Sequence, residues 1–425
     1  MKPIIKGLVV CMILMATACK KDTSFEHNGS APITVDQFTP ASGGAGTEVL
    51  LYGTNFSKNV SEVSVTVNGV KAYVEGTVED RILIVIPQKA GSGKIEVTIN
   101  GRSVASKADF NYLPSSVVST LAGTGTAGFA DGTGRLASFN FNARCGLDVD
   151  ADGNLFVADP GNRRVRKITP DGTVTTVAGN GNYGYKEGKG EEAEFYLPFD
   201  VVTDPTTGNL YVSDPEAWTV RRITPDGTTS RVCWGEAWGL GIDKRNGMVY
   251  YANTSSGAIV QVRPDGSTKD IATGFTYPSD VTVDSQGNLY VVEHGKSVIW
   301  KLNADTWEPT LIAGQPDVTG LVNGIGAAAK FDMPWAITAD RSNNLYIAGN
   351  GTWDGSGSNS NQCIRRIAAG TWEVSTYIGG STAGFADGTG SAALFYAPTG
   401  VTVDKNGVVY VLDRNNQRVR KIITE

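Results

Sequence analysis

Histidine is scarce in this chain of 425 residues, which limits the chemistry that it can perform. Only His27, in a polar stretch near the N-terminus, and His294, directly after an apolar run, are present. A zinc site of the histidine-rich kind needs more imidazoles than these, and a serine or cysteine triad needs one beside its nucleophile. The sequence therefore predicts neither kind of site, and we expect His294 to be a polar residue in a loop.

Carboxylates are the other groups that could do chemistry. Asp200 and Asp280 begin two equivalent apolar runs, but two acids make a sparse calcium cage. Acid–glycine pairs recur three times, at Asp131-Gly132, Glu187-Gly188 and Asp387-Gly388. These pairs could touch calcium, although such pairs more often build turns. We therefore predict no cofactor and leave calcium binding open.

Aromatic side chains gather where the equivalent apolar runs begin. Flat rings with Asn, Asp and Arg beside them suit stacking on pyranose rings and hydrogen bonding to hydroxyl groups. The candidate ligand-binding residues are Phe199, Trp218, Trp238, Tyr277, Trp335 and Trp353, together with Arg144 and Asp200. Trp353 lies in an unusually long loop, residues 349–362. The alternative left open is that the rings only pack inside the molecule.

A segment that recurs six times between residues 146 and 425 must position these candidates. The best copies read GLDVDADGNLFVADPGNRRVRKITPDGTVTTVAG (146–179) and GVTVDKNGVVYVLDRNNQRVRKI (400–422). The aspartates that close the first apolar run are Asp150, Asp204, Asp243, Asp284, Asp340 and Asp404, separated by 54, 39, 41, 56 and 64 residues. A period of about forty residues with insertions is typical of a four-stranded propeller blade. The sequence therefore predicts an all-β fold containing a six-bladed propeller.

Each copy divides into four short strands, a to d from the propeller axis outward. In the first copy Asp152-Gly153 separates a from b, and Pro170-Asp171-Gly172 separates c from d. These residues supply the positive φ that tight hairpins require. The a–b and c–d hairpins form one rim of the disc, the a–b rim. The longer b–c turns and d–a connectors form the opposite rim, the b–c rim, which carries the aromatic candidates.

The two ends of the repeat region complement each other. The last copy ends after its c strand, whereas residues 116–123 (SVVSTLAG) read as a d strand without a blade. The TAGFADGTG that follows, residues 126–134, is identical to residues 382–390. We therefore predict that residues 116–123 complete the last blade and close the ring, which removes its open edges.

The repeat resembles NHL repeats. The pattern P-x-G-V-x-V-D-x-x-G-N-L-Y-V-x-D followed by N-x-R-V-R-K-I is matched best at residues 144–168 and 398–422, and the resemblance covers residues 115–425. It implies a propeller and says little about function. Amidating lyases that resemble NHL propellers use several channel histidines, and six-bladed calcium lactonases place acids at the channel mouth. Strand a begins in this chain, in blade order, at Arg144, Phe199, Trp238, Ser279, Trp335 and Thr399.

The first residues resemble a bacterial lipoprotein signal. Lys2 and Lys6 precede an apolar stretch, residues 7–15, that is too short to span a bilayer, and small residues lead to Cys19. The resemblance implies that residues 1–18 are a signal peptide, that Cys19 is lipidated and that residues 19–30 are a tether. A plain cleaved signal with an incidental cysteine is the alternative.

A separate segment of alternating strands and glycine-rich turns occupies residues 31–113, enough for a small β-sandwich. Its TPASGGAGTEVLLYGTNF (39–56) closely resembles the start of IPT/TIG immunoglobulin-like domains, which usually serve as spacers or dimerising modules. We therefore predict an IPT/TIG domain over 31–113, followed by the propeller over 115–425.

Composition narrows the remaining choices. The few cysteines do not make a disulfide scaffold, so we expect Cys145, Cys233 and Cys363 to be buried. A net charge of −6 argues against a nucleic-acid partner. Arginines recur at the same place on strand c of several copies, which indicates a structural position of the repeat.

These features together predict a lipid-anchored protein exposed on the cell outer membrane, with no other contact to the membrane. Its predicted role is non-catalytic binding of a glycan, or another extracellular ligand, for uptake through an outer-membrane transport partner. Two alternatives stay open. One is an extracellular, calcium-assisted lyase or hydrolase on the same rim, and the other is a protein-interaction platform in an envelope complex.

Overall fold

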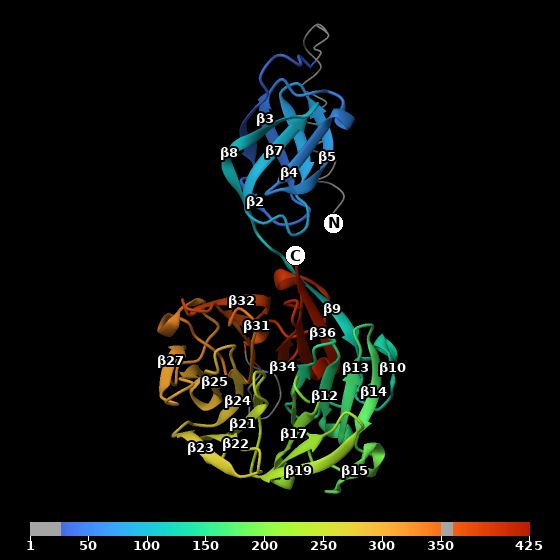
Figure 1. The fold of residues 1–425 in the computed structure, drawn as a ribbon, viewed down its shortest axis with the longest axis vertical. Helices are drawn as coiled ribbons and strands as arrows, with labels where there is room; N and C mark the ends of the chain where they lie inside the picture. The colour runs from blue at the N-terminus through green and yellow to red at the C-terminus, as the bar shows by residue number, and fades with distance from the viewer. Residues whose placement is uncertain (1–26, 350–359) are drawn as a thin grey trace. The chain divides into compact units, whose positions relative to one another are not determined.

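The computed structural model describes residues 27–349 and 360–425. These residues form β-strands and short 3₁₀ turns arranged in two compact units, one reaching Ser115 and the other Ser116–Thr424. Figure 1 shows the strands of both units. None of the helical turns in this part of the chain has the length and apolar character needed to cross a bilayer. The predicted all-β class is confirmed.

The first unit is an eight-stranded sheet around one apolar core. Its strands are β1 (Thr34–Thr39), β2 (Ser42–Gly43), β3 (Glu48–Thr54), β4 (Val63–Val67), β5 (Val70–Val78), β6 (Arg81–Val85), β7 (Gly93–Ile99) and β8 (Arg102–Tyr112). They pair in the order β1-β3-β6-β5-β4-β7-β8-β2, and β1 also lies against β8, so the sheet nearly closes. The period-2 pattern explains the core, since Val63, Val65 and Val67 of β4 are buried while the alternate Ser64 and Thr66 are half-exposed.

The second unit is a ring of six antiparallel sheets, which follow one another from green to red in Figure 1. Blades 1 to 3, from strand a to strand d, are β11 (Leu147–Val149), β12 (Leu155–Asp159), β13 (Arg164–Ile168) and β14 (Thr173–Ala178); β16 (Asp200–Thr203), β17 (Leu210–Asp214), β18 (Thr219–Ile223) and β19 (Thr228–Trp234); and β20 (Leu240–Asp243), β21 (Met248–Asn253), β22 (Ala258–Val262) and β23 (Thr268–Thr273). Blades 4 to 6 are β24 (Pro278–Val283), β25 (Leu289–Glu293), β26 (Val298–Leu302) and β27 (Pro309–Ala313); β29 (Ala336–Ala339), β30 (Leu345–Ala348), β31 (Gln362–Ile367) and β32 (Glu373–Gly380); and β34 (Pro398–Val403), β35 (Val409–Asp413), β36 (Arg418–Thr424) and β9 (Ser116–Ala122).

The last blade joins the two ends of the propeller, as predicted. Strand β9 pairs antiparallel with β36, from Ser116 opposite Thr424 to Ala122 opposite Val419. The turquoise β9 therefore lies beside the red β36 in Figure 1. This pairing supplies the missing d strand of blade 6 and closes the ring, which leaves no open blade between its first and last repeats.

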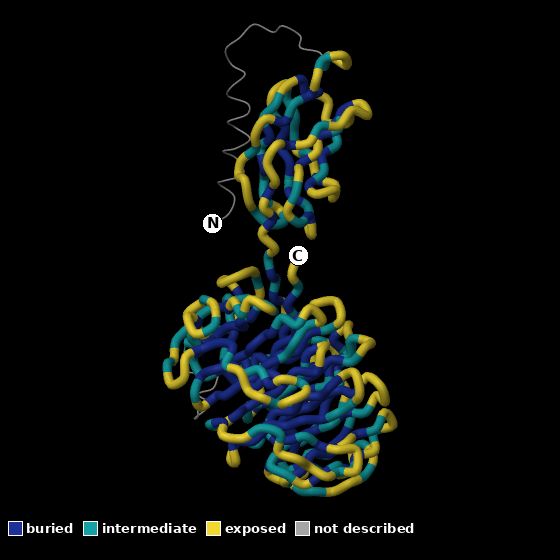
Figure 2. The backbone as a smooth tube through the Cα atoms, turned by 60° about the vertical axis from the view of Figure 1, so that its left-hand side comes forward, coloured by how far each residue is buried: buried dark blue, intermediate teal, exposed yellow. Residues whose placement is uncertain are grey.

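The long d–a connectors cover the outer edges of four blades. Each contributes a two-residue strand that pairs with the outer strand of its blade: β10 (Gly132–Thr133), β15 (Gly188–Lys189), β28 (Gly324–Ile325) and β33 (Gly388–Thr389). The 3₁₀ turns are η1 (Val60–Glu62), η2 (Gly134–Leu136), η3 (Pro160–Asn162), η4 (Gly190–Glu192), η5 (Pro215–Ala217), η6 (His294–Lys296), η7 (Gly326–Ala328), η8 (Gly390–Ala392) and η9 (Arg414–Asn416). In Figure 2 the strands are dark blue inside each unit and the turns are yellow, so the rims are the accessible surface.

Buried phenylalanines and arginines anchor the connectors. Each of the four connectors contains a fully buried ring, at Phe139, Phe195, Phe331 and Phe395. A fully buried arginine occupies the same position of strand c in blades 1, 2, 5 and 6, at Arg166, Arg221, Arg365 and Arg420. The predicted structural role of the recurring arginines is therefore confirmed. The predicted burial of Cys145, Cys233 and Cys363 is confirmed as well, and all three are free thiols.

One buried arginine shows how the connector is held. The guanidinium of Arg166 donates to Asp159 at 2.8 Å and to Asp131 at 2.7 Å, and also to the carbonyl oxygens of Ser138 and Ala130. Strand c is thereby tied to strand b and to two places in the connector at once. Burial raises the pKa of Asp159, which shows that its environment disfavours an unpaired charge.

Candidate functional site

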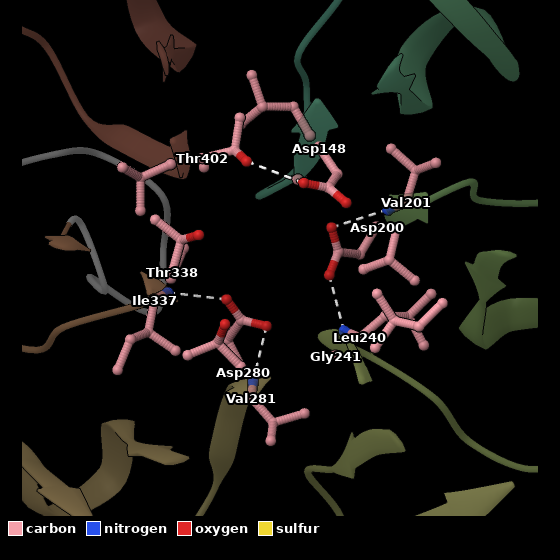
Figure 3. A pocket seen from close by; sticks show the side chains of 18 of the residues that line it. Asp148, Asp200, Val201, Leu240, Gly241, Asp280, Val281, Ile337, Thr338 and Thr402 are labelled. Carbon is pink, nitrogen blue, oxygen red and sulfur yellow. Dashed lines mark hydrogen bonds between the residues drawn. The ribbon is translucent and has the colours of Figure 1, made fainter. Parts of the chain in front are cut away.

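The central channel of the propeller holds a cavity of about 90 Å³, lined by the a strands of the six blades. Three carboxylates point into it, from Asp148, Asp200 and Asp280 (Figure 3). Each is less than a tenth exposed, with exposed fractions of 6%, 8% and 8%. The channel is therefore a small cavity with three buried carboxylates in its wall.

Asp200 and Asp280 occupy the same repeat position in blades 2 and 4 and make the same contacts. Asp200 accepts hydrogen bonds from the backbone N–H groups of Val201 at 2.8 Å and Leu240 at 2.7 Å. Asp280 accepts from Val281 and Ile337, each at 2.8 Å. Each carboxylate therefore joins its own a strand to that of the next blade.

The environment of this pair favours the protonated form. Burial, and to a smaller extent the charge of Asp148, raise the pKa of Asp200 to about 7. Burial and the charge of Asp200 raise the pKa of Asp280 well above its ordinary value. Gly146 beside the pair is required for space, because a Cβ there would lie 1.7 Å from Asp200 Oδ1.

Asp148 is bound differently from the other two carboxylates. It accepts from the N–H and hydroxyl of Thr203 and from the hydroxyl of Thr402, and it lies 3.2 Å from the ammonium of Lys244. Lys244 is half exposed on the a–b rim, where a second hollow of about 300 Å³ adjoins the channel. Arg341 and Lys405 also line this hollow, so the a–b mouth carries basic side chains that the sequence did not single out.

Four of the predicted ligand-binding residues form one cluster at the b–c end of the channel. The Phe199 ring lies edge-on to Trp238, with centroids 4.9 Å apart, and 6.2 Å from Trp335. The Arg144 guanidinium carbon lies 4.4 Å from the centroid of the Trp335 ring. Phe199 and Trp335 are only 4% exposed, while Trp238 is half-buried and donates from Nε1 to Glu236 at 3.0 Å.

His294 completes this cluster. It opens the b–c turn η6, as expected for a loop residue, but it is buried with its ring centroid 5.1 Å from that of Trp335. Its Nδ1 lies 3.1 Å from the carbonyl oxygen of Pro334. Burial lowers the pKa of His294 to about 4, so the imidazole is neutral at physiological pH. The cluster therefore packs around the end of the channel as a largely buried group of rings.

The other predicted site residues are dispersed. Trp218 follows the b–c turn η5 and is 61% exposed, and Tyr277 precedes β24 and is 46% exposed. Asp200 lies in the channel wall, below the rim. Trp353 and Cys19 lie outside the described residues. The assignment of these residues to ligand binding stays a prediction.

The acid–glycine pairs of the connectors are engaged with the protein itself. Asp131 binds Arg166, Asp387 binds Arg420 at 2.7 Å, and Glu187 accepts from the N–H of Arg231. Within residues 27–349 and 360–425, no group of three His, Cys, Asp or Glu side chains has an arrangement that could hold a metal ion. The geometry thus favours the structural interpretation of these pairs over calcium binding.

Similarity to known proteins agrees with this architecture. Residues 33–112 match the IPT/TIG domain family, and residues 395–422 match the NHL repeat family. The chain contains an IPT/TIG domain and an NHL repeat. Both predicted resemblances are therefore confirmed, the second at the last copy of the repeat.

Longer stretches of the chain are similar to curated proteins and to solved structures. Human NHL repeat-containing protein 2 is 27% identical over 308 residues, which cover 68% of this chain and 40% of that protein. The chain spans no more than about two fifths of the length of the first curated relatives that it matches. The structure of an auxiliary nutrient binding protein from Bacteroides ovatus is 23% identical with a TM-score of 0.63, over 94% of this chain and all of the other. One of the same name from Bacteroides thetaiotaomicron is 20% identical with a TM-score of 0.60, over 94% and 99%. These two structures show a common fold.

Proposed function

We propose that the protein is a non-catalytic ligand-binding protein, anchored through a lipid on Cys19 to the outer surface of the outer membrane. Its ligand is a glycan, bound on the b–c rim of the propeller and passed to a transport partner for uptake. The observation that carries this proposal is the set of aromatic rings on that rim, of which Trp218 and Tyr277 are accessible and a further group around Phe199 is buried.

The size of the channel supports binding at the rim over catalysis inside. Pockets that enclose small-molecule ligands measure about 300–1,000 Å³, whereas the channel cavity measures about 90 Å³. A sugar ring cannot enter that space and reach Asp200 or Asp280. The accessible rings on the rim are Trp218 and Tyr277, and Trp238 is half-buried beside the carboxylate of Glu236. These rings offer flat apolar faces to a sugar.

The names of two proteins with the same fold add support. Both Bacteroides structures are called auxiliary nutrient binding proteins. A nutrient binder on a cell surface needs an anchor and an accessible recognition face. The lipoprotein-like N-terminus and the aromatic rim would supply these two parts.

A calcium-assisted lyase or hydrolase on the same propeller face is the second candidate. The three carboxylates of the channel are the acidic groups that the propeller brings together at its axis, although they are not arranged as a metal site, so this candidate requires a cation bound at that face. Measuring the calcium content after exhaustive dialysis separates the two functions, because a binder of the proposed kind retains none. A third possibility, a protein-interaction platform in an envelope complex, predicts capture of envelope proteins and no binding to glycans.

Two experiments test the proposed function. Metabolic labelling with a palmitate analogue should mark the wild type and not Cys19→Ala, and an unlabelled wild type contradicts the anchor. A glycan array probed with the full-length protein in detergent should give reproducible binding to one class of polysaccharide. An array without any binding contradicts the glycan ligand.

A further inference from the structure

Blade 2 carries an unusual surface. Three of its large aromatic side chains are more than half exposed: Tyr183 at 62%, Trp218 at 61% and Trp234 at 57%. Together these three residues form what we call the blade 2 platform. Exposed rings of this size are rarely left accessible without a function when several lie near one another.

Contacts within the blade bring the three residues together. The hydroxyl of Tyr183 donates to Glu216 Oε2 at 3.0 Å, and Glu216 lies in the 3₁₀ turn that ends at Trp218. The carbonyl oxygen of Trp218 accepts from the N–H of Gly235, the residue that follows Trp234. All three residues therefore lie where the connector, the b–c turn and the end of the outer strand of blade 2 meet.

Polar groups hold two of the rings from one side. The Arg231 guanidinium carbon lies 4.2 Å from the centroid of the Trp234 ring, and that of Arg163 lies 5.2 Å from the centroid of Tyr183. Tyr183 also packs edge-on against Tyr196, with centroids 4.7 Å apart, and Trp234 lies 6.1 Å from Tyr185. Neighbouring side chains therefore hold both rings while more than half of each side chain stays exposed. Rings that are held in place in the free protein lose less entropy when a ligand binds.

Comparison among the blades shows that the fold does not need these rings. The bridge that pairs Tyr183 with Phe195 is formed by Thr319 in blade 5 and by Ala383 in blade 6. The left-handed residue after the b–c turn is Trp218 here and Arg163, Ser297 or Gln417 in three other blades. Trp234 ends its outer strand where three other blades have a glycine of positive φ, at Gly123, Gly179 and Gly314.

A repeat protein provides its own control through such comparisons. Positions that the structure requires carry the same chemistry in the copies that share that structure, as the buried arginines of blades 1, 2, 5 and 6 do beside their connectors. The three platform positions instead hold small or polar residues in other blades and aromatic residues in blade 2 alone among the copies compared. Their exposure and their departure from the repeat both indicate a role outside folding.

We propose that the blade 2 platform is the principal sugar-binding surface, stacking on the pyranose rings of a neutral glycan. This inference rests on the proposed function and deepens it by moving the main contact from the channel end to one blade. The aromatic-only composition favours a sugar over a protein. The accessible large apolar residues of blade 2 are Tyr183, Trp218 and Trp234, whereas exposed aliphatic residues such as Leu136 and Ile325 lie in blades 1 and 5.

The polar neighbours of the platform also suit a neutral sugar. Glu216 is exposed and can accept from hydroxyl groups, and Arg163 and Arg231 can donate to them. The acid and the two arginines lie among the rings, so no single charge dominates the surface. A strongly charged polysaccharide is therefore disfavoured compared with a neutral one.

Affinity electrophoresis in gels containing a neutral polysaccharide, with the full-length protein in detergent, tests the inference. The panel includes amylopectin, xyloglucan, galactomannan and a β-glucan, with pectin as the charged comparison. The wild type should be retarded by at least one neutral polymer. Tyr183→Ala/Trp218→Ala/Trp234→Ala should weaken that binding by on the order of a hundredfold, as expected when the dominant contacts of an interface are removed.

Matched variants make the result specific. Tyr73→Ala removes a ring that is 70% exposed in the other unit and should leave affinity unchanged. Trp218→Phe/Trp234→Phe preserves flat rings and should retain most of the binding, which loss of structure would not allow. Circular dichroism and melting should match the wild type for all variants, because the replaced side chains are largely exposed.

The possible failures are distinguishable. If the wild type and the triple variant bind a polysaccharide with the same affinity, the platform is not the sugar-binding surface. The proposed function is not contradicted by that result. A wild type that binds no member of the panel or of the glycan array overturns both. Retardation by pectin alone contradicts the preference for neutral glycans.

Discussion

The buried arginines of strand c explain at the level of single residues why the R-x-R pattern recurs. Arg166 is fully buried and satisfies Asp159 and Asp131 together with two connector carbonyl groups. Arg222 of blade 2, which follows the buried Arg221 on the same strand, is exposed and has no such partners within the core. The repeat thus keeps one arginine of each pair in the core, whereas the other is half-buried in blades 1, 5 and 6 and exposed in blade 2.

Arg166→Ala should therefore destabilise the propeller strongly. Removing one partner leaves Asp159 buried without its counter-charge, and breaking a buried ion pair in this way costs about 3–5 kcal/mol. Urea unfolding of the full-length protein measures the difference. Arg222→Ala is the matched control and should change the free energy of unfolding by less than about 0.5 kcal/mol. Equal effects of the two substitutions would contradict the structural role of Arg166.

The channel carboxylates should make stability depend on pH. Since burial raises the pKa of Asp200 to about 7 from an ordinary value of 3.8, the folded protein keeps a proton that the unfolded chain releases. The contribution of Asp200 to the free energy of unfolding is therefore largest below about pH 4, falls as the pH rises to about 7, and is constant above that.

Comparing the wild type with Asp200→Asn isolates this contribution from other titrating groups. His294 acts in the opposite direction, because its pKa is lowered to about 4 and its neutral form stabilises the fold as the pH rises. Between about pH 5 and about pH 8 the wild type should lose at least about 1 kcal/mol more of its free energy of unfolding than the variant. Urea titrations at both pH values give this difference, and identical losses would show that Asp200 ionises normally.

At the level of elements, the repeat made the fold predictable from the sequence. The burial of individual site residues was not predictable, because it depends on contacts between blades. The blade count, the hairpins and the role of residues 116–123 all follow from matching one copy of the repeat with another. The burial of Phe199 and Trp335 does not follow from such matching. It depends on Trp238, Arg144 and His294, which pack against these two rings from other blades.

Two platform residues were missed for a different reason. Tyr183 lies in a connector and Trp234 ends an outer strand, whereas most of the predicted site residues directly precede strand a. The signal was nevertheless present, since Tyr183 in GNGNYG replaces the alanine of GTGTAG. Asp148 was missed because its apolar run, GLDVD, has no acid at that position in the other copies.

The ring closure makes a strong prediction about one element. Strand β9 buries Val118 and Ala122 and pairs with β36 along its length. A protein that begins at Gly125 lacks this strand and exposes an unpaired edge with its apolar face. Its free energy of unfolding should be several kcal/mol lower than that of a protein that begins at Pro114. This is a large fraction of the stability of a typical domain. Thermal melting compares the two, and equal melting temperatures would contradict closure by β9.

At the level of the whole molecule, the chain combines two units with separate cores. The core of the first unit contains residues from Ile33 to Tyr112 only, and the propeller has its own cores between blades. Each unit therefore contains the apolar contacts that its fold requires, which is the property expected of independent domains. An independent first unit is also what the proposed function expects, since a spacer must fold without the propeller.

Independence of the first unit can be tested directly. Residues 31–113 contain every strand from β1 to β8, with fully buried side chains such as Val49, Leu51, Phe56 and Phe110. Expressed alone, they should give a dispersed amide spectrum by NMR and one cooperative melting transition, because no core residue is left behind in the propeller. Calorimetry of the full-length protein should then show this transition beside that of the propeller. A collapsed amide spectrum would mean that the first unit needs the propeller to fold, and the spacer role would fail with it.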